Sequence, residues 1–428
     1  MKQLSLTDLR HLMTDRLGFL ERHHKQMGAI LHFQALGTDM FVVSEPTLIR
    51  ELLIKHGPQM QRDALSTLIF KRMTGDSVFT TEGEMWQRQR KMMQPAFHAQ
   101  RIQSYAETMA LYTREMLATW SKGKTVAIDK AFAELTLRIM AKTMLGVDLQ
   151  SQVTKIGRHM NRLVSVAEQQ LQAGYLPPVW LPTPMNMRHA WAKWRVRSLL
   201  RQLVRQRQAA GVDNGDLLSM ILFARDEQGQ PMSEKEAVDQ LVSLFFAGQD
   251  TTSAALTWAW YLLLEYPEAA QRVQAEVGNK PLSLERVANL PYLEAVIKET
   301  LRLYPTATFI TRMVVDPFTI GGRHFPKGAL IIINIFEMHR RSELFCDPAC
   351  FRPERFLDKV QPPERYAYMP FGAGARVCMG NMFARLEAQV ILATMLQQVA
   401  LERANHEPVV MDMQISLRPR DPLLVRVV

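Results

Sequence analysis

One apolar segment, residues 241–264, limits what this chain can fold into more than any other feature. It carries a single charged residue, Asp250, and its length and apolarity would permit a membrane-spanning helix. Polar side chains nevertheless lie together at its centre, where they are most costly in lipid: Gln249, Asp250, Thr251, Thr252 and Ser253. The chain has no second comparable segment. We therefore expect a long helix buried in a soluble protein without a membrane span, whose polar cluster serves a site.

The composition is that of a folded chain with a large core. Of the 428 residues, 47% are hydrophobic and 22% are charged, which excludes a disordered, collagen-like or low-complexity protein. Length alone would permit about two to four domains, but the sequence contains no domain-joining linker and no internal repeat. We expect a single domain over residues 1–428. It should be mainly α with a small β part near residues 29–44, 307–333 and 408–428.

Three features of the sequence indicate the cellular compartment and the partners of the protein: its N-terminus, its cysteine content and its charge. The N-terminal residues carry charges throughout and lack the apolar core of a signal peptide. Three cysteines, Cys346, Cys350 and Cys378, are too few for a disulfide scaffold, so we expect a cytoplasmic protein. The net charge of +10 suits nucleic acid, anionic lipid or an acidic protein. No helix-turn-helix, zinc or aromatic–basic module for nucleic acid is evident.

Hydrophobic periodicity and turn residues predict the order of the elements. Strands are expected at 29–34 and 39–44, and the stretch 307–333 is expected to be β-rich. The stretches 60–83, 176–185 and 347–370 are expected to be irregular. Helices are expected near the N-terminus, from residue 46, between 86 and about 174 with breaks at Pro95 and 122–123, and at 187–209, 233–266, 291–304 and 380–398.

The segment 370–380 carries the most informative chemistry. Its glycines, among other small residues, let the backbone approach a bulky flat group closely. Cys378 lies just before a predicted helix, where N–H groups and the helix dipole stabilise a thiolate, and Arg376 adds a positive charge. Such a thiolate is a soft metal ligand. The alternative, from these residues alone, is a glycine-rich turn with a buried cysteine.

The pattern Phe371-x-x-Gly374-x-Arg376-x-Cys378-x-Gly380 resembles the haem-binding loop of the cytochrome P-450 superfamily, with every fixed position present. The resemblance implies the cytochrome P-450 fold, a helix-rich triangular prism with haem between the long central helix and the cysteine-loop helix. It implies that Cys378 is the axial thiolate ligand of haem b (iron protoporphyrin IX), a ligation that favours O–O cleavage. The other haem-binding residues implied in this loop are Phe371, Gly372, Arg376 and Gly380.

Residues 247–252, at the centre of the long helix, resemble the oxygen-activation motif of the same family. Threonine hydroxyls beside an acid and a small glycine can open the helical hydrogen-bond ladder and make room for a ligand. A capping or surface cluster is the alternative, and the apolar flanks disfavour it. The resemblance implies that Thr251 hydrogen-bonds the iron-bound dioxygen species, that Asp250 relays protons and that Ala247 lines the distal pocket. Asp250 and Thr251 are therefore the candidate catalytic residues.

Glu299 and Arg302 share one face of a predicted helix. Exposed, such an ion pair would contribute only ~0.2–0.5 kcal/mol, but apolar neighbours favour burial, where an unpaired charge is costly. The family pairs this Glu and Arg with an arginine of a Pro-Glu-Arg-Phe segment, which is Arg355 here. The resemblance implies a structural triad beneath the haem.

Further site residues are also implied by the resemblance. Trp86 and Arg90 match the family's Trp-x-x-x-Arg pattern, and with Arg312 and Arg376 they are expected to bind the haem propionates. His98 and His339 suit either the haem edge or the surface. The substrate pocket is expected to involve the loop around 65–79 and Phe246, Ala247, Thr306, Ala307, Ile310, Ser416 and Leu417.

The resemblance implies a haem-thiolate monooxygenase that uses O2 to hydroxylate or epoxidise a hydrophobic small molecule. The stretch 299–305 is most similar to fatty-acid and terpenoid-hydroxylating members, so a long-chain fatty acid or terpenoid is expected. Two alternatives stay open: a peroxide-dependent peroxygenase or isomerase on the same fold, and a non-enzymatic haem sensor or carrier.

Electrons are expected to come from a separate protein, because no flavin or iron–sulfur domain follows Val428. NAD(P)H would then act indirectly, through a ferredoxin or flavodoxin with its reductase, on a monomeric enzyme. Basic residues near Trp86 and farther along the chain could steer an acidic electron donor. They are Arg88, Arg90, Lys91, Arg340 and Arg341. The alternative is that they form a solvated basic face.

Overall fold

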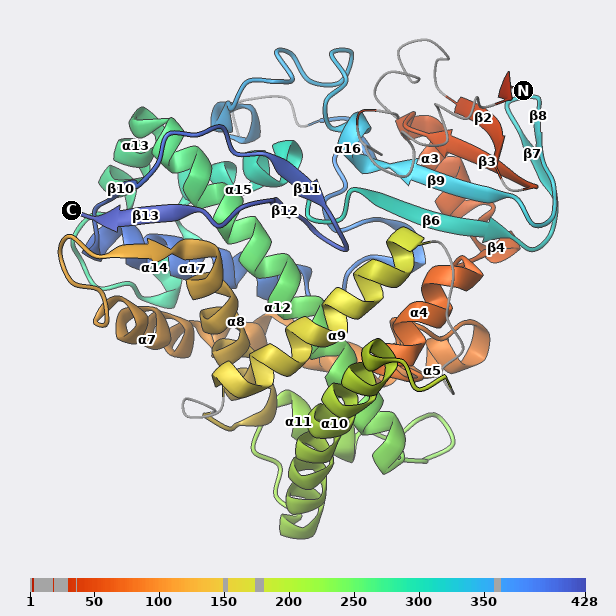
Figure 1. The fold of residues 1–428 in the computed structure, drawn as a ribbon, viewed down its shortest axis with the longest axis horizontal. Coiled ribbons are helices and arrows are strands. Elements are labelled where there is room, and N and C mark those ends of the chain that lie inside the picture. Colours follow the sequence, from red (N-terminus) through yellow and green to blue (C-terminus); the bar gives the residue numbers. More distant parts are fainter. Residues whose placement is uncertain are drawn as a thin grey trace. The chain divides into compact units, whose positions relative to one another are not determined.

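The computed structural model of the chain describes residues 2–3, 18, 30–35, 37–148, 153–173, 181–357 and 363–428. The chain forms two compact units, both drawn in Figure 1. Unit 1 comprises Met1–Ser66, Ala295–Cys378 and Met411–Arg418, and unit 2 comprises Thr67–Glu294, Met379–Val410 and Pro419–Val428. The first half of the loop expected at 176–185 lies outside the described residues, as does the helix expected near the N-terminus apart from residue 18.

Unit 1 contains a six-stranded sheet with the strand order β1-β2-β3-β9-β6-β4, whose central strands lie side by side in Figure 1. β2 and β3 form an antiparallel hairpin, β3 runs parallel to β9, and β9 runs antiparallel to β6. The strands are β1 Lys2–Gln3, β2 Ile30–Ala35, β3 Thr38–Val43, β4 Met60–Gln61, β6 Phe309–Val314 and β9 Leu330–Asn334. The two N-terminal strands and the β-rich stretch expected from the sequence are confirmed.

Both faces of this sheet are apolar. Because successive side chains of a strand point to opposite faces, Phe41 and Val43 enter one buried cluster, whereas Val42 enters another. The first cluster also takes Ile49 and Leu52 from α3. The remaining elements of unit 1 are α3 Pro46–Ile54, η1 Gly57–Gln59, β7 Phe318–Ile320, β8 Arg323–Phe325, α16 Ile335–Met338, η3 Pro353–Phe356, η4 Gly374–Arg376, β11 Met411–Met413 and β12 Leu417–Pro419.

Unit 2 is largely helical. A small antiparallel sheet accompanies its helices, in the order β10-β13-β5, with bounds Leu401–Arg403, Leu424–Val427 and Thr125–Ala127. The helices lying wholly or partly in unit 2 are α4 Ala64–Thr74, α5 Gly83–Met93, η2 Gln94–Phe97, α6 Ala99–Gln103, α7 Ala106–Leu117, α8 Ile128–Leu145, α9 Val153–Ala173, α10 Pro184–Ala210, α11 Leu217–Phe223, α12 Glu234–Glu265, α13 Pro267–Val277, α14 Leu284–Ala288, α15 Pro291–Leu303 and α17 Asn381–Gln398.

Helix α12 is the buried helix expected at 233–266. A capping box begins it: the Ser233 hydroxyl accepts from the Glu236 N–H (3.2 Å), and the Glu236 carboxylate accepts from the Ser233 N–H (2.8 Å). Buried side chains lie on all its faces, and α8, α10 and α17 pack against it. No helix in the described part of the chain is long and apolar enough to cross a membrane.

One expectation about local structure is wrong, and another is right but missed an element. The stretch 60–83 is not irregular throughout, because α4 occupies Ala64–Thr74. Asp63 accepts a hydrogen bond from the Ser66 N–H (2.8 Å) and so caps this helix, whereas the serine and threonine beside it suggested a loop. The break expected at 122–123 is followed by the short strand β5, which exists because it pairs with β13 from the far end of the chain.

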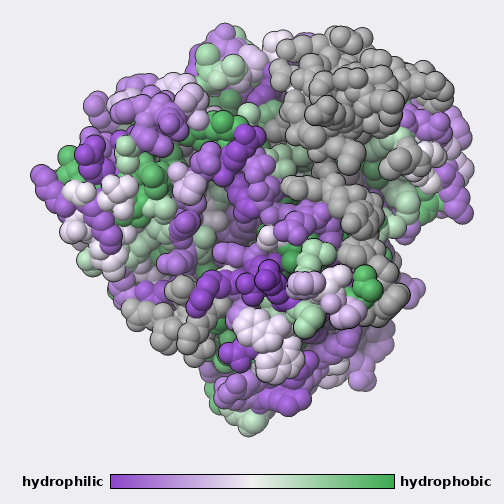
Figure 2. Space-filling model, in the orientation of Figure 1, coloured by the Kyte–Doolittle hydropathy of each residue, from purple (hydrophilic) through white to green (hydrophobic). Residues whose placement is uncertain are grey.

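Figure 2 shows hydrophilic residues over most of the described surface on one face of the molecule, with apolar residues in small groups between them. This is the distribution of a folded protein whose large apolar side chains are mostly buried.

Candidate functional site

The cysteine loop of unit 1 comes close to neighbouring residues at two glycines. Gly374 has a φ of +72°, and a Cβ there would lie 3.3 Å from the Leu53 carbonyl oxygen at the end of α3. Gly372 has a φ of +70°, and a Cβ there would lie 3.2 Å from a methyl group of Ile310 on β6. Both positions therefore favour glycine through conformation and space.

Cys378 closes this loop. Its N–H donates to the Phe371 carbonyl (3.0 Å), and the Val377 N–H donates to the Gly374 carbonyl (3.2 Å). The Cys378 side chain is exposed, and none of the three cysteines forms a disulfide. The chain then passes Gly380 and begins α17 at Asn381.

These residues fit a metal that brings most of its ligands with it. No cluster of three or more His, Cys, Asp or Glu able to hold a metal ion exists among the described residues. One accessible cysteine on a glycine-lined loop would be enough to hold a porphyrin-bound iron, because the porphyrin itself brings most of the iron's ligands.

Glu299, Arg302 and Arg355 are brought together in unit 1. The fully buried Glu299 accepts two hydrogen bonds from Arg302, both 2.8 Å, and one from Arg355 Nε (3.0 Å). Arg302 is also fully buried, and it donates to the carbonyl oxygens of His339 (2.8 Å) and Pro348 (2.7 Å). Each buried charge thus has partners, which such burial requires.

His339 is not a surface residue, although the sequence left that reading open. It is completely buried, and its Nε2 accepts a hydrogen bond from the Met369 N–H (3.0 Å). Burial, followed by the charges of Arg302 and Arg340, lowers the pKa of His339 to about 3. His339 is therefore neutral at ordinary pH. His98, by contrast, is exposed before α6.

The other expected site residues of unit 1 lie on its strands and turns. Arg312 is half-buried on β6 and donates to the Thr311 carbonyl (2.8 Å), and Arg376 is half-buried in η4. Two segments expected to form the substrate pocket meet where the Leu417 N–H donates to the Thr306 carbonyl (3.0 Å). Of the remaining residues expected in this pocket, Ser416 is buried, Ile310 half-buried and Ala307 exposed.

In unit 2, residues 247–252 lie within α12, which runs unbroken through them. The Thr251 hydroxyl donates to the Ala247 carbonyl one turn earlier (2.7 Å), and Asp250 is half-buried. A Cβ at Gly248 would lie 2.4 Å from the Met140 sulfur on α8. The small residue expected to make room for a ligand therefore makes room for a neighbouring helix.

Trp86 and Arg90 share one face of α5, and the guanidinium carbon lies 5.6 Å from the centre of the indole ring. Phe246, on α12, belongs to a second aromatic group. Its ring centre lies 5.6 Å from that of Phe70 on α4 and 5.9 Å from that of Phe79. Phe70 and Phe79 thus pack against Phe246 of α12 in unit 2.

Glu387, on α17, was missed by sequence reasoning. Its side chain is completely buried, and neither carboxyl oxygen has a hydrogen-bond partner of good geometry among the described residues. Burial raises the pKa of Glu387 well above its ordinary value, and only the Thr252 hydroxyl opposes this rise. The available signal was an acid inside the apolar run of the last helix. The structure places it against the residue that follows Thr251.

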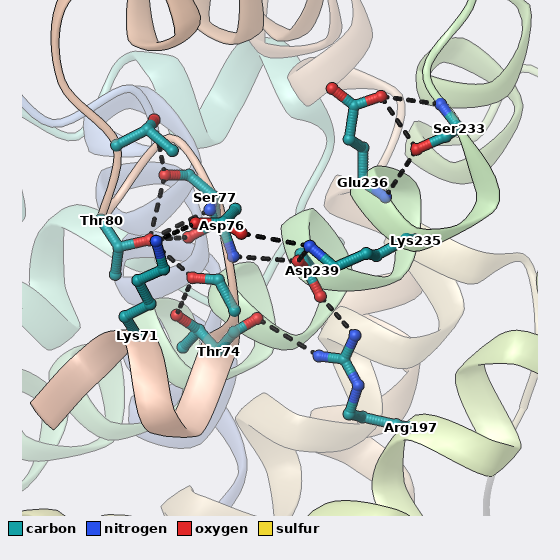
Figure 3. Close-up of polar contacts among 12 residues, drawn as sticks. Lys71, Thr74, Asp76, Ser77, Thr80, Arg197, Ser233, Lys235, Glu236 and Asp239 are labelled. Atoms are coloured by element: carbon teal, nitrogen blue, oxygen red, sulfur yellow. Dashed lines mark hydrogen bonds and ion pairs between the residues drawn. The ribbon is translucent and has the colours of Figure 1, made fainter. Parts of the chain in front are cut away.

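A second missed group is centred on Asp239, near the start of α12. Figure 3 shows its carboxylate between Arg197 of α10, Lys235 and the backbone of Asp76. The Asp76 N–H donates to it at 2.9 Å, and the Asp239 side chain is completely buried. These partners lie far apart in the sequence, so local patterns gave no sign of them.

The basic residues considered for electron-donor docking have partners within the chain. Arg88 pairs with Asp226 (2.6 Å) and Glu236 (2.7 Å), and Lys91 pairs with Glu227. Of the two arginines farther along, Arg340 donates to the Leu303 carbonyl, and Arg341 pairs with Glu45 (2.9 Å). The acidic partners offset part of the positive charge that Arg88, Lys91 and Arg341 would present to an acidic electron donor.

Comparison with known sequences points to one family. The family described as Cytochrome P450 matches residues 6–426. Cyclooctat-9-en-7-ol 5-monooxygenase of Streptomyces melanosporofaciens is 34% identical over 364 residues, which cover 83% of this chain and 78% of that protein. Pentalenene oxygenase of Streptomyces avermitilis is 28% identical over 368 residues, covering 84% and 81% of the two chains.

Solved structures agree. The structure titled "Retinoic acid bound cyanobacterial CYP120A1" matches with a TM-score of 0.87 at 28% identity, covering 98% of this chain and 96% of that one. The haem domain of cytochrome P450DA matches with a TM-score of 0.88 at 22% identity, which shows the shared fold. The expected fold class is thereby confirmed. The chain belongs to the cytochrome P450 family and is a cytochrome P450 monooxygenase with a haem-thiolate iron cofactor.

Proposed function

We propose that this enzyme hydroxylates or epoxidises an isoprenoid, with Cys378 as the axial ligand of haem b. The observation that carries the proposal is the cysteine loop, in which the Cys378 N–H is held by the Phe371 carbonyl and the thiol stays exposed. The haem supplies the oxygen chemistry when it is bound. The residues proposed to hold it are Phe371, Gly372, Arg376, Cys378, Gly380 and Arg312 in unit 1, and Trp86, Arg90 and Ala247 in unit 2.

Asp250 and Thr251 are proposed to handle protons. The Thr251 hydroxyl donates its hydrogen to the Ala247 carbonyl (2.7 Å). Its oxygen can therefore accept a further hydrogen bond. A donor such as a water molecule can therefore be positioned by a hydrogen bond to the Thr251 oxygen, and the half-buried Asp250 is proposed to relay protons towards it. Glu299, Arg302 and Arg355 keep their expected structural role in unit 1.

The substrate class is supported by the relatives. One is named for a monooxygenation of cyclooctat-9-en-7-ol, and another for the oxygenation of pentalenene. A third carries bound retinoic acid. All three ligands have isoprenoid carbon skeletons, which favours the terpenoid over the fatty acid. Electrons are proposed to come from a separate ferredoxin or flavodoxin.

The haem assignment is tested with Cys378→Ser. Wild-type protein should show the thiolate-type spectrum of reduced haem with carbon monoxide, and the variant should lose it. A Cys346→Ser control should keep it, because Cys346 is an exposed residue outside the cysteine loop. An unchanged spectrum in Cys378→Ser would show that another group ligates the iron.

The proton role is tested with Thr251→Ala. The variant should keep consuming NAD(P)H with its redox partners, but product formed per NAD(P)H should fall at least about tenfold. Thr257→Ala is a matched control, because Thr257 donates the same kind of bond to the Ser253 carbonyl (2.8 Å) farther along α12. Equal coupling in wild type and Thr251→Ala would remove Thr251 from the mechanism.

A further inference from the structure

The first half of α10 carries a stripe of exposed apolar side chains. Met187, Trp191 and Trp194 are 61%, 49% and 57% exposed, and their spacing of four and then three residues places them on one face of the helix. The guanidinium carbon of Arg195 lies 5.9 Å from the centre of each of the two indole rings. Single exposed apolar residues are common on proteins, whereas a contiguous group of them marks a surface that contacts another body.

The same helix has basic residues and no acidic one. The basic residues are Arg188, Lys193, Arg195, Arg197, Arg201, Arg205 and Arg207. From Arg197 onwards the arginines have acidic partners, in the pairs Arg197–Asp239, Arg201–Glu234, Arg205–Glu234 and Arg207–Asp216. Arg188 and Arg195 are exposed, and neither forms an ion pair with an acidic residue in the described part of the chain. The positive charge that is not balanced therefore lies in the half of α10 that carries the apolar stripe.

Helix α9 adds to this positive charge. It packs against α10, and the ring of His159 on α9 meets the ring of Trp191 edge to face, with 4.7 Å between their centres. Burial, followed by the charges of Arg195, Arg162 and Arg158, lowers the pKa of His159. Three guanidinium groups from two helices thus lie near one exposed indole ring, and Arg162 is itself exposed.

This combination of side chains suits the surface of a lipid bilayer. Tryptophan is enriched where hydrocarbon meets water, because its ring is apolar and its N–H is polar. Arginine binds lipid phosphates while the stem of its side chain lies along apolar groups. A second copy of this chain would bring the same positive charge against the stripe and be repelled. Nucleic acid would satisfy the arginines but would place Met187 against a charged backbone.

We propose that this face of unit 2 docks the enzyme on the surface of an anionic lipid bilayer without spanning it. The residues of the face are Met187, Arg188, Trp191, Trp194 and Arg195 of α10 and Arg162 of α9, and we call it the α10 face. The apolar stripe enters the interface, and the arginines bind the lipid phosphates around it. This inference goes beyond the proposed function and does not depend on the identity of the substrate.

Sedimentation of the haem-loaded enzyme with large vesicles tests the docking. Vesicles of phosphatidylcholine alone are compared with vesicles of phosphatidylcholine and phosphatidylglycerol in equal parts. Wild-type enzyme should bind the mixed vesicles at least about tenfold more strongly, because basic residues are attracted to an anionic surface. High salt should weaken this binding, because it screens the attraction.

Two double variants separate the apolar and the charged contributions. Trp191→Ala with Trp194→Ala removes most of the apolar stripe, and Arg188→Glu with Arg195→Glu reverses the charge beside it. Each should lower the partition coefficient onto the mixed vesicles by about tenfold or more. Both should keep the wild-type spectrum of reduced haem with carbon monoxide, because these four residues are exposed and lie outside the cysteine loop.

Matched controls change other exposed residues of unit 2. Lys122→Glu with Lys130→Glu alters the net charge by the same amount, before β5 and in the first turn of α8. Leu111→Ala removes a side chain of α7 that is 45% exposed. Because neither change touches the α10 face, binding to the mixed vesicles should stay within about twofold of wild type.

The proposal is overturned if wild-type enzyme binds neither kind of vesicle, or if both α10 variants bind the mixed vesicles as wild type does. If charge reversal weakens binding and the tryptophan change does not, the face is a general site for polyanions, and the lipid proposal fails. A single-stranded oligonucleotide is titrated in parallel. If it binds wild type more tightly than the mixed vesicles do and both α10 variants lose it, the partner is nucleic acid and the lipid proposal fails as well.

Discussion

Two glutamates, Glu299 and Glu387, are both completely buried and yet stand in opposite surroundings. Glu299 accepts hydrogen bonds from Arg302 and Arg355, so the structure supports its charge. Among the described residues, only the Thr252 hydroxyl opposes the effect of burial on Glu387, so its pKa is raised and the protonated form is favoured. At the scale of one residue, the same side chain is therefore an ionic anchor in one unit and a neutral acid in the other.

Glu387→Gln should change how stability depends on pH. Glu387 has a raised pKa in the folded protein, so unfolding releases its proton at any pH between the ordinary value of 4.5 and the raised one. Within this range the Glu387 contribution lowers the free energy of unfolding by about 1.4 kcal/mol for each pH unit of increase. Glutamine cannot titrate, so the free energy of unfolding of the variant should rise relative to that of wild type as the pH rises.

Denaturant unfolding of both proteins at pH 5, 6.5 and 8 measures this difference. If the difference in free energy of unfolding between the two proteins were the same at all three pH values, Glu387 would have an ordinary pKa. The carbonyl stretch of a protonated carboxylic acid, present in the wild-type infrared spectrum and missing in the variant, gives an independent check.

Glu299→Gln should destabilise strongly, because it leaves the fully buried Arg302 without its counter-charge. Breaking a buried ion pair costs about 3–5 kcal/mol. Arg352→Gln breaks a neighbouring pair with Asp347, whose side chains are 51% and 59% exposed, and should cost no more than about 1 kcal/mol. Urea unfolding of both variants compares them, and equal costs would refute the structural role of the triad.

At the scale of elements, α12 does more than place Asp250 and Thr251. Its first turns bind the segment 75–80 through Asp239 and Gln240, and its later turns carry Ala247 and the Thr251 hydroxyl. Through α4 and this segment, Phe70 and Phe79 are brought against Phe246. One helix thus connects the shape of the aromatic wall to the residues proposed for proton handling.

Gly75→Ala should show how tightly this segment is held. Both Gly75 and Gly37 have a positive φ, of +87° and +77°, but only at Gly75 would a Cβ meet other atoms, those of the Asp239 carboxylate. Gly37→Ala should cost about 1–2 kcal/mol for conformation alone. Gly75→Ala should cost about 1–3 kcal/mol more, because the carboxylate is held by Arg197 and cannot move aside.

Thermal or urea unfolding gives the two costs, and hydrogen exchange at the Asp76 and Val78 amides reports on the segment directly. Exchange there should accelerate in Gly75→Ala and stay at the wild-type rate in Gly37→Ala. Similar stability and exchange in both variants would show that Asp239 does not anchor the segment.

At the scale of the whole molecule, the net charge of +10 is the property that a partner would meet first. Arg88, Lys91 and Arg341 have acidic partners within the chain. The attraction between this protein and an acidic donor should therefore come from the summed charge and not from these residues.

Reduction by an acidic ferredoxin should accordingly slow by about tenfold or more between low and high salt, because salt screens long-range steering. Lys91→Glu changes one exposed residue that is already paired with Glu227. It should leave the salt dependence of the reduction rate nearly unchanged. Stopped-flow reduction across a range of ionic strength measures both. A reduction rate independent of salt would exclude electrostatic steering. If the reduction rate of Lys91→Glu no longer depended on salt, the donor would dock on α5.

Much of the fold could be predicted because it depends on local patterns. The bounds and the apolar run of α12, the two N-terminal strands and the helix after Cys378 were all expected within a few residues of what is observed. The helix α4 and the strand β5 could not be predicted in this way. In the first, turn-forming residues are overridden by a cap and by burial, and in the second a distant strand supplies the pairing.

The sequence by itself determined which residues come together in the cysteine loop and in residues 247–252, because their spacing is short and the covalent chain alone brings each motif together. Only the tertiary structure decided which buried polar groups are satisfied. The partners of Asp239, Gln240 and Glu299 come from other segments, whereas burial of Glu387 raises its pKa and favours its neutral form. The physical reason is that burial and pairing depend on which segments pack together, and the packing of distant segments cannot be read from any one of them.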